Sequence, residues 1–200
     1  GLLKRDPDDP SSKPHLMHGM RPIGTVNIFR AMANLPEVRL ATEANADMLK
    51  KAGQLGSGVP GGPEAVGRAA TYMIQAHPFS IAGRNDISNA FCALNRLFAA
   101  KILKQYCAPS LLRAFLFIYA FPTGNGTYLD GEILIFWTTC GTTQGCGTGV
   151  TIFDVVYTMG VLICLMVLVH ENSLLKKEEF LALGLHDDTT TVMVAELIIE

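Results

Sequence analysis

The sequence has few charged residues, and its acidic and basic residues are nearly equal in number. Only 17% of its 200 residues are charged, 49% are hydrophobic, and the formal net charge is −2. Soluble domains average about a quarter charged residues, so this composition excludes long intrinsic disorder for most of the chain. The small net charge also means that no overall basic field attracts nucleic acid.

Cysteine pairs of the kind that hold zinc are missing. The five cysteines are scattered, no Cys-x-x-Cys occurs, and the closest pair, Cys140 and Cys146, has no matching His or Cys pair. Free or buried thiols in a reducing compartment are therefore the better interpretation. The first residues, from Gly1, contain no apolar stretch typical of a secretory signal, and we expect the chain to be a piece of a longer reading frame.

Apolar periodicity predicts alternating helices and strands after a polar lead-in. Glycine- and proline-rich loops are expected at 54–64 and 141–149. Helices are expected at 28–35 (ending near Pro36), 40–51, 64–77, 89–106, 111–121 and 150–169. Strands are expected at 79–87, 180–185 and 191–199, with a hairpin over 127–138 around Asp130-Gly131. This pattern predicts an α+β or α/β domain.

Acidic residues stand at the ends of apolar segments. Asp86 closes the first strand, and Asp187-Asp188 lie in a tight turn between two apolar strands. Acids in such turns are commonly solvated turn formers. Brought side by side, however, they could hold two divalent cations, which prefer oxygen ligands. Two cations about 4 Å apart stabilise both oxygens of an in-line phosphoryl displacement.

Five short segments follow one another in a specific order. They are Arg21-Pro22-Ile23, the Gln-x-Gly stretch within 54–66, Asp86-Ile87-Ser88-Asn89-Ala90-Phe91, the glycine-rich turn 141–146, and Leu185-His186-Asp187-Asp188. In this order and spacing they resemble the fingers segment and palm motifs A, B and C of reverse transcriptases, in particular those of non-LTR (LINE-type) retrotransposons. The likeness covers about residues 21–195.

The resemblance implies an α+β fold: a polymerase palm, whose antiparallel sheet carries the catalytic acids and has helices packed on one face, with a partial fingers region. Residues 1–20 are then a lead-in that we expect to be mobile, 21–78 the partial fingers region, and 79–200 the palm with its three motifs. The thumb is expected to be absent, since the chain stops at Glu200.

The resemblance also implies RNA-templated DNA synthesis, in which dNTPs are transferred to a primer 3′ end by two metal ions. Asp86, Asp187 and Asp188 would be the catalytic metal ligands, with Mg²⁺ (or Mn²⁺) as cofactor. Phe91 falls where the family places a ring that excludes the 2′-hydroxyl. The remaining nucleotide-binding residues implied are Gln144, Gly145 and Arg21.

A basic segment accompanies these motifs. Residues 84–113 contain five basic residues and one acid, and Arg96, Lys101 and Lys104 are the candidates for nucleic-acid binding; a solvated helix face is the alternative. The implied partners are an RNA template, a DNA primer, dNTPs and the remaining domains of a longer polyprotein, with no obligate membrane. The family implies the nucleus or cytoplasm, although no localisation signal is present.

Some residues depart from the family pattern. Leu185 replaces an aromatic residue, His186 stands where a small or apolar residue is commoner, and Gly147-Thr148 replaces Pro-Leu. Arg84 and Asn85 interrupt a strand expected to be buried, where unpaired polar groups cost several kcal/mol. These departures are typical of a fragment or of a decaying element.

Two alternatives therefore stay open. The run 150–169 has Asp154 as its only charge and is long enough to span about 30 Å of hydrocarbon, which would suit a membrane-anchored, non-enzymatic protein. A palm helix buried on nearly all sides explains the same run. The other alternative keeps the fold without the chemistry, as a non-catalytic palm remnant.

Overall fold

The computed structural model describes residues 28–87, 89–129, 132–143, 146–172 and 179–194. The predicted lead-in (1–20) and three of the predicted nucleotide contacts lie outside these ranges. They are Arg21, Gln144 and Gly145.

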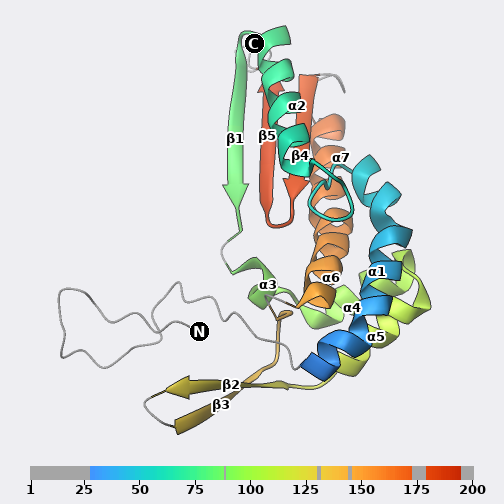
Figure 1. The fold of residues 1–200 in the computed structure, drawn as a ribbon. Helices are drawn as coiled ribbons and strands as arrows, with labels where there is room; N and C mark the ends of the chain where they lie inside the picture. The colour runs from blue at the N-terminus through green and yellow to red at the C-terminus, as the bar shows by residue number, and fades with distance from the viewer. Residues whose placement is uncertain (1–27, 88, 130–131, 144–145, 173–178, 195–200) are drawn as a thin grey trace, which may run out of the picture.

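A three-stranded antiparallel sheet forms one half of the described structure. Its order is β1 (Ser80–Asp86), β5 (Asp188–Val194), β4 (Phe180–Leu185), so β5 is the central strand. Helix α2 (Gly62–Ala76) lies across the sheet and contacts all three strands (Figure 1). Strand β1 is an edge strand, and nearly all of its side chains are exposed.

A group of helices forms the other half, beside the end of the sheet at which β1 finishes (Figure 1). Its members are α1 (Ile28–Lys51), α3 (Ala90–Ala93), α4 (Arg96–Tyr106), α5 (Pro109–Tyr119) and α6 (Gly147–Tyr157). Their shared core buries Leu49, Leu103, Phe115 and Ile152 almost completely. Helix α6 continues through the π-helical segment η1 (Thr158–Leu162) into α7 (Ile163–Asn172).

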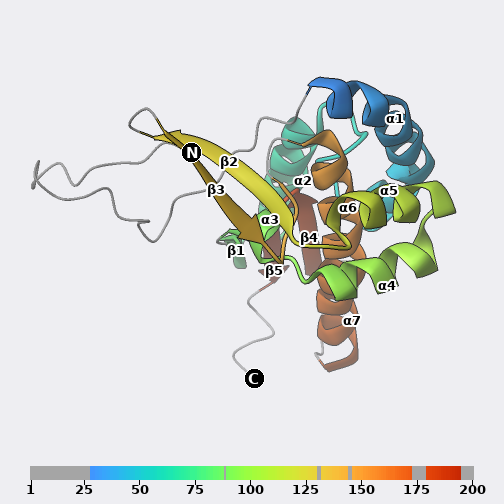
Figure 2. The ribbon, with the colours of Figure 1, turned by 90° about the horizontal axis from the view of Figure 1, so that it is seen from below.

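A hairpin of β2 (Thr123–Leu129) and β3 (Glu132–Thr138) projects from the body as an arm, most plainly in Figure 2. Ile133, Ile135 and Trp137 alternate along β3, lie on one face, and are each about two-thirds exposed or more.

The predicted α+β fold class is confirmed, and two helix boundaries were predicted wrongly. Pro36 does not end a helix, because α1 runs through it without a break. Pro36 is exposed, so water can satisfy the carbonyl that its missing N–H leaves unpaired. The helix expected over 89–106 is instead two helices, because the side chain of Asn95 accepts a hydrogen bond from the Phe98 amide (2.9 Å) and begins α4 there.

Candidate active site

The three predicted acids lie at the same end of the sheet. Asp86 is the last residue of β1 and lies directly opposite Asp188, the first residue of β5. Residues opposed in this way point to the same face, with Cβ atoms about 5 Å apart. Asp187 lies in the turn that joins β4 to β5. In Figure 1 this end of the sheet points toward α3.

Arg84 binds one of these acids. Its guanidinium donates to Oδ2 of Asp188 at 2.6 Å, and the hydrogen bond and charge of Asp188 raise the pKa of Arg84. The sequence predicted that Arg84 and Asn85 would be costly in a buried strand. That prediction was wrong, because β1 is an exposed edge strand and Arg84 has an acidic partner.

The buried carboxylate of Asp154 is hydrogen-bonded to His186, a residue of the acidic turn. His186 precedes Asp187 and has a left-handed backbone (φ 57°). Its Nδ1 lies 2.8 Å from Oδ2 and 3.0 Å from Oδ1 of Asp154, which is fully buried in α6. The hydroxyl of Ser57 donates to the same carboxylate. The hydrogen bond that the Asp154 carboxylate accepts raises the pKa of His186, an effect that partial burial opposes.

Gln54 fixes the backbone of the same turn. Its side chain is fully buried, accepts hydrogen bonds from the amides of His186 and Gly56 (3.0 Å each), and donates to the carbonyl of His186 (3.2 Å). The loop also pairs with β4, since the Leu55 amide donates to the carbonyl of Gly184 at 2.8 Å. The Gln-x-Gly loop, α6 and the acidic turn therefore form one hydrogen-bonded unit.

Sequence reasoning missed this unit, although a signal was present. Asp154 is the only charge in a twenty-residue apolar run, and a buried charge needs a partner. That rule could have directed attention to His186, which departs from the family pattern. The sequence could not show which segment would supply the partner, because Ser57 and His186 are 97 and 32 residues away from Asp154.

The predicted sugar-selecting ring, Phe91, lies within a column of aromatic side chains. It is 7% exposed, and its ring centroid is 4.5 Å from that of Phe153, which stacks on Tyr157 at 5.6 Å. The hydroxyl of Tyr157 bonds to that of Thr189 on β5. The column thus links α3 and α6 to the strand that carries Asp188, and the role of Phe91 toward a nucleotide stays a prediction.

Arg96 makes its contacts within the protein. Its guanidinium donates to the carbonyls of Gly141 (2.9 Å) and Phe121 (3.0 Å) and lies over the ring of Tyr119. It therefore joins the base of the hairpin to the turn before α6. Lys101 and Lys104 are exposed on α4. That all three bind nucleic acid stays a prediction.

The three acids have the ligand atoms that a metal ion prefers, but their arrangement in the described residues does not form a metal site. Carboxylates are the ligands that Mg²⁺ prefers, and Asp86 and Asp188 share one face. Within the described ranges, no group of three or more His, Cys, Asp or Glu lies close enough to hold a metal ion. One of the carboxylates is also bonded to Arg84.

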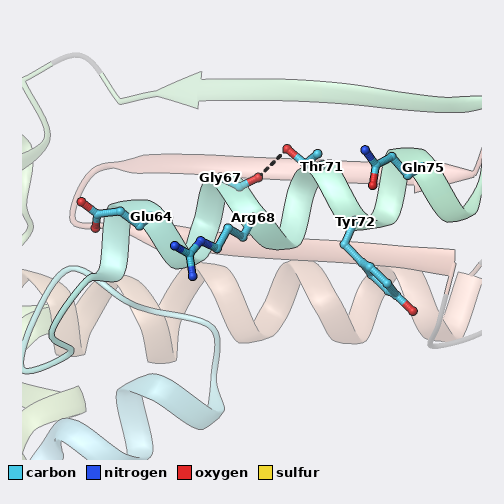
Figure 3. A pocket seen from close by; sticks show the side chains of 6 residues that line it. All are labelled: Glu64, Gly67, Arg68, Thr71, Tyr72 and Gln75. Carbon is cyan, nitrogen blue, oxygen red and sulfur yellow. Dashed lines mark hydrogen bonds between the residues drawn. The ribbon is translucent and has the colours of Figure 1, made fainter.

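A surface hollow of about 430 Å³ lies elsewhere, and all of its lining residues belong to α2. Figure 3 shows these side chains, with the Thr71 hydroxyl donating to the carbonyl of Gly67 at 2.8 Å. They are Glu64, Gly67, Arg68, Thr71, Tyr72 and Gln75. Because a single helix lines it, the hollow is a feature of the α2 surface, separate from the acids.

One described helix, Gly147–Glu171, is long and apolar enough to cross a membrane by length and composition, and 44% of its most apolar stretch is buried. The α6 half is buried from Thr151 to Tyr157 against the other helices. Asp154 lies inside the fold with hydrogen-bonding partners. The burial of Asp154 is what we expect if the α6 half is a helix of the protein core.

No protein-family model matches the sequence, and no curated protein matches it. The fold is similar to two solved structures. One is telomerase from Candida albicans in complex with a TWJ fragment of telomeric RNA, with a TM-score of 0.56 and 12% identity over 78% of this chain. The other is apo telomerase from Candida tropicalis, truncated from its C-terminal domain, with a TM-score of 0.58 and 15% identity over 80% of this chain.

This chain spans 29% and 34% of the lengths of those two chains. At such low identity the likeness concerns the fold alone. The described α+β structure is therefore similar to a part of these telomerase structures.

Proposed function

We propose that the chain is the palm with a partial fingers region of a reverse transcriptase that copies an RNA template into DNA. One observation carries the proposal: Asp86, Asp187 and Asp188, which the sequence motifs single out, lie at one end of an antiparallel sheet whose surrounding fold is similar to telomerase structures. Telomerases are reverse transcriptases, so the likeness of the fold supports what the motifs suggest.

The finer proposal is a non-LTR retrotransposon enzyme, as the order of the motifs suggests. Asp86, Asp187 and Asp188 would hold Mg²⁺ (or Mn²⁺), which when bound supplies the neutralising charge for the triphosphate and lowers the pKa of the primer hydroxyl. The protein itself would position the acids, because Gln54 and Asp154 form hydrogen bonds with His186 in the acidic turn.

The substrates would be an RNA template, a DNA primer and dNTPs. Phe91, Gln144, Gly145 and Arg21 would surround the incoming nucleotide, and a bulky ring at Phe91 would select deoxyribose. Lys101 and Lys104 are exposed on α4 and, with Arg96, would contact the nucleic-acid backbone. The remaining domains of the polyprotein would supply the rest of the binding channel.

Primer extension on an RNA template with dNTPs and Mg²⁺ tests the proposal. The comparison is between the wild-type chain, Asp187→Asn, and the matched control Asp47→Asn on the exposed surface of α1. We expect extension by the wild type and the control that disappears in Asp187→Asn. Absence of extension by a folded wild-type chain would contradict activity of this chain and favour the non-catalytic remnant. The ion pair between Arg84 and Asp188 is consistent with that alternative, because it occupies one of the proposed metal ligands.

A further inference from the structure

We propose that two copies of this chain associate through the outward face of α5, packed antiparallel about a two-fold axis. The proposal goes beyond the polymerase function and does not depend on it. We call this face the α5 stripe, and its members are Arg113, Leu116, Phe117, Ala120 and Phe121.

Helix geometry places these residues on one side. Their spacing of three or four residues recurs along one face of an α-helix. Helix α5 is followed by its cap residue Ala120, which keeps a helical backbone and donates its amide to the Leu116 carbonyl at 3.0 Å. Phe121 therefore follows Phe117 by about one turn. The opposite side of α5 is buried in the helix group, where α1, α4 and α6 contact it.

The stripe is apolar where an outward face is expected to be polar. Phe117 is 87% exposed, Phe121 is 80% exposed and Leu116 is 42% exposed, whereas a surface helix normally carries polar side chains on this side. Exposed apolar clusters that contain aromatic rings mark interaction surfaces. The α5 stripe therefore has the character of a docking surface.

The charge of the stripe indicates which partner covers it. Arg113 is its only charged residue. That is too little charge for a nucleic-acid backbone, because each phosphate contact takes its own Lys or Arg. An apolar partner suits the stripe, and the same stripe of a second copy is such a surface. Symmetric pairing of identical faces is the commonest form of association.

Arg113 also selects the orientation. In a parallel pair, the two Arg113 side chains would lie side by side and repel each other. In an antiparallel pair centred on Phe117, the two Phe117 rings meet at the axis, and each Arg113 lies against Phe121 of the second copy. A guanidinium over an aromatic face is attractive, and the chain already contains such a contact, with Arg96 5.2 Å from the ring centroid of Tyr119. The two Arg113 residues are then about 12 Å apart along the helices, beyond the screening length at physiological salt.

The area of the stripe sets the expected strength. An aromatic side chain buries about 150–250 Å². The two exposed rings, with Leu116 and the apolar stem of Arg113, therefore supply about 500 Å² per copy. The dimer would bury about 1,000 Å² in total, which is near the lower limit for a specific interface. We expect a reversible dimer with a dissociation constant on the order of 10 μM.

Sedimentation velocity of the whole chain between about 1 and 200 μM tests the proposal. Phe117→Ser changes the residue at the axis. Its matched control is Phe79→Ser, because Phe79 is also an exposed ring (65%) but lies just before β1. We expect the wild type and Phe79→Ser to reach the mass of a dimer, and Phe117→Ser to weaken dimerisation by about tenfold or more. Circular dichroism verifies that each variant is folded.

A double-mutant cycle tests the orientation. Arg113→Gln and Phe121→Leu should each weaken the dimer several-fold, because each removes one partner of the same contact. The double variant should then lose less than the product of the two single losses. Independent losses would contradict the antiparallel pairing. The cycle also decides the proposal if Phe117→Ser does not fold.

Other occupants of the stripe give different results. A wild-type chain that stays monomeric at every concentration overturns the proposal. Binding of a fluorescent oligouridylate that is lost in Phe117→Ser would then assign the stripe to nucleic acid. A dimer that persists in Phe117→Ser and disappears in Trp137→Ser also overturns it, because the exposed face of the hairpin would then be the interface. Primer extension is measured separately, so its failure leaves the dimer proposal intact.

Discussion

Removal of the His186 side chain should destabilise the whole fold. His186→Ala leaves the fully buried Asp154 carboxylate with the Ser57 hydroxyl as its remaining hydrogen-bonding partner among those described above. An isolated buried charge is costly because it loses its hydration without compensation. The acidic turn also loses its side-chain attachment to α6, although Gln54 still bonds its backbone.

The size of the loss follows from the burial of the pair. Deleting one partner of a buried ion pair costs about 3–5 kcal/mol. The side chain of His186 is 38% exposed, so water can reach the vacated site and reduce the penalty. We expect the free energy of unfolding to fall by about 2–3 kcal/mol. Combined with Asp154→Asn, the loss should be smaller than the sum of the two single losses.

The effect should depend on pH. Asp154 raises the pKa of His186 above its ordinary value of 6.5. A raised folded-state pKa contributes stability that is fully present below the unfolded-state pKa and is lost as the pH rises through the folded-state pKa. The difference between the wild type and His186→Ala should therefore be largest near about pH 6 and smaller near about pH 9.

Urea unfolding followed by circular dichroism measures these differences. His170→Ala is the matched control, because His170 is exposed on α7 and its one described ring contact is edge-on with Phe180. It should change the free energy of unfolding by less than about 1 kcal/mol. Equal stability of His186→Ala and the wild type, or a difference that does not change with pH, would refute the reasoning.

Three further predictions concern other contacts. Arg96→Ala should lower the free energy of unfolding by about 2–3 kcal/mol in the same urea assay, because the carbonyls of Gly141 and Phe121 lose their charged donor. Gly184→Ala should lower the melting temperature measured by circular dichroism, because a Cβ there would lie 2.9 Å from Nε2 of Gln54; an unchanged melting temperature would contradict this. Cys107 should react slowly with a thiol reagent at about pH 8, since burial raises its pKa to about 11, and mass spectrometry of the labelled chain measures the rate against the exposed Cys140.

The local elements were predictable because their signals lie within short segments. The hairpin and the strand–turn–strand around Asp187 follow from β-prone residues on either side of turn residues. Their bounds differ from the prediction: the hairpin, expected over 127–138, begins at Thr123, and the last strand, expected from 191, begins at Asp188. Helix breaks were less predictable. Pro36 is a strong stop signal that does not end α1, and Asn95 is a start signal inside an apparently continuous pattern.

The candidate site was predictable only in part. The three acids could be placed at one end of a sheet from their motifs, because Asp86 ends a strand and Asp187 and Asp188 lie at the turn between two strands. The contacts around them depend on distant segments. Arg84 reaches Asp188 across 104 residues, and Gln54 reaches His186 across 132, and no local periodicity encodes such pairings.

The π-helical segment η1 between α6 and α7 changes which residues of the long apolar helix lie on a given face. A π turn takes up about one residue more than an α turn, which rotates everything after it by about 100°. Helix α6 is buried on all sides from Thr151 to Tyr157, whereas Val161 in η1 and Val167 and Leu168 in α7 are exposed. The apolar run is therefore explained by burial in its α6 half, whereas its α7 half is apolar without being buried to the same extent.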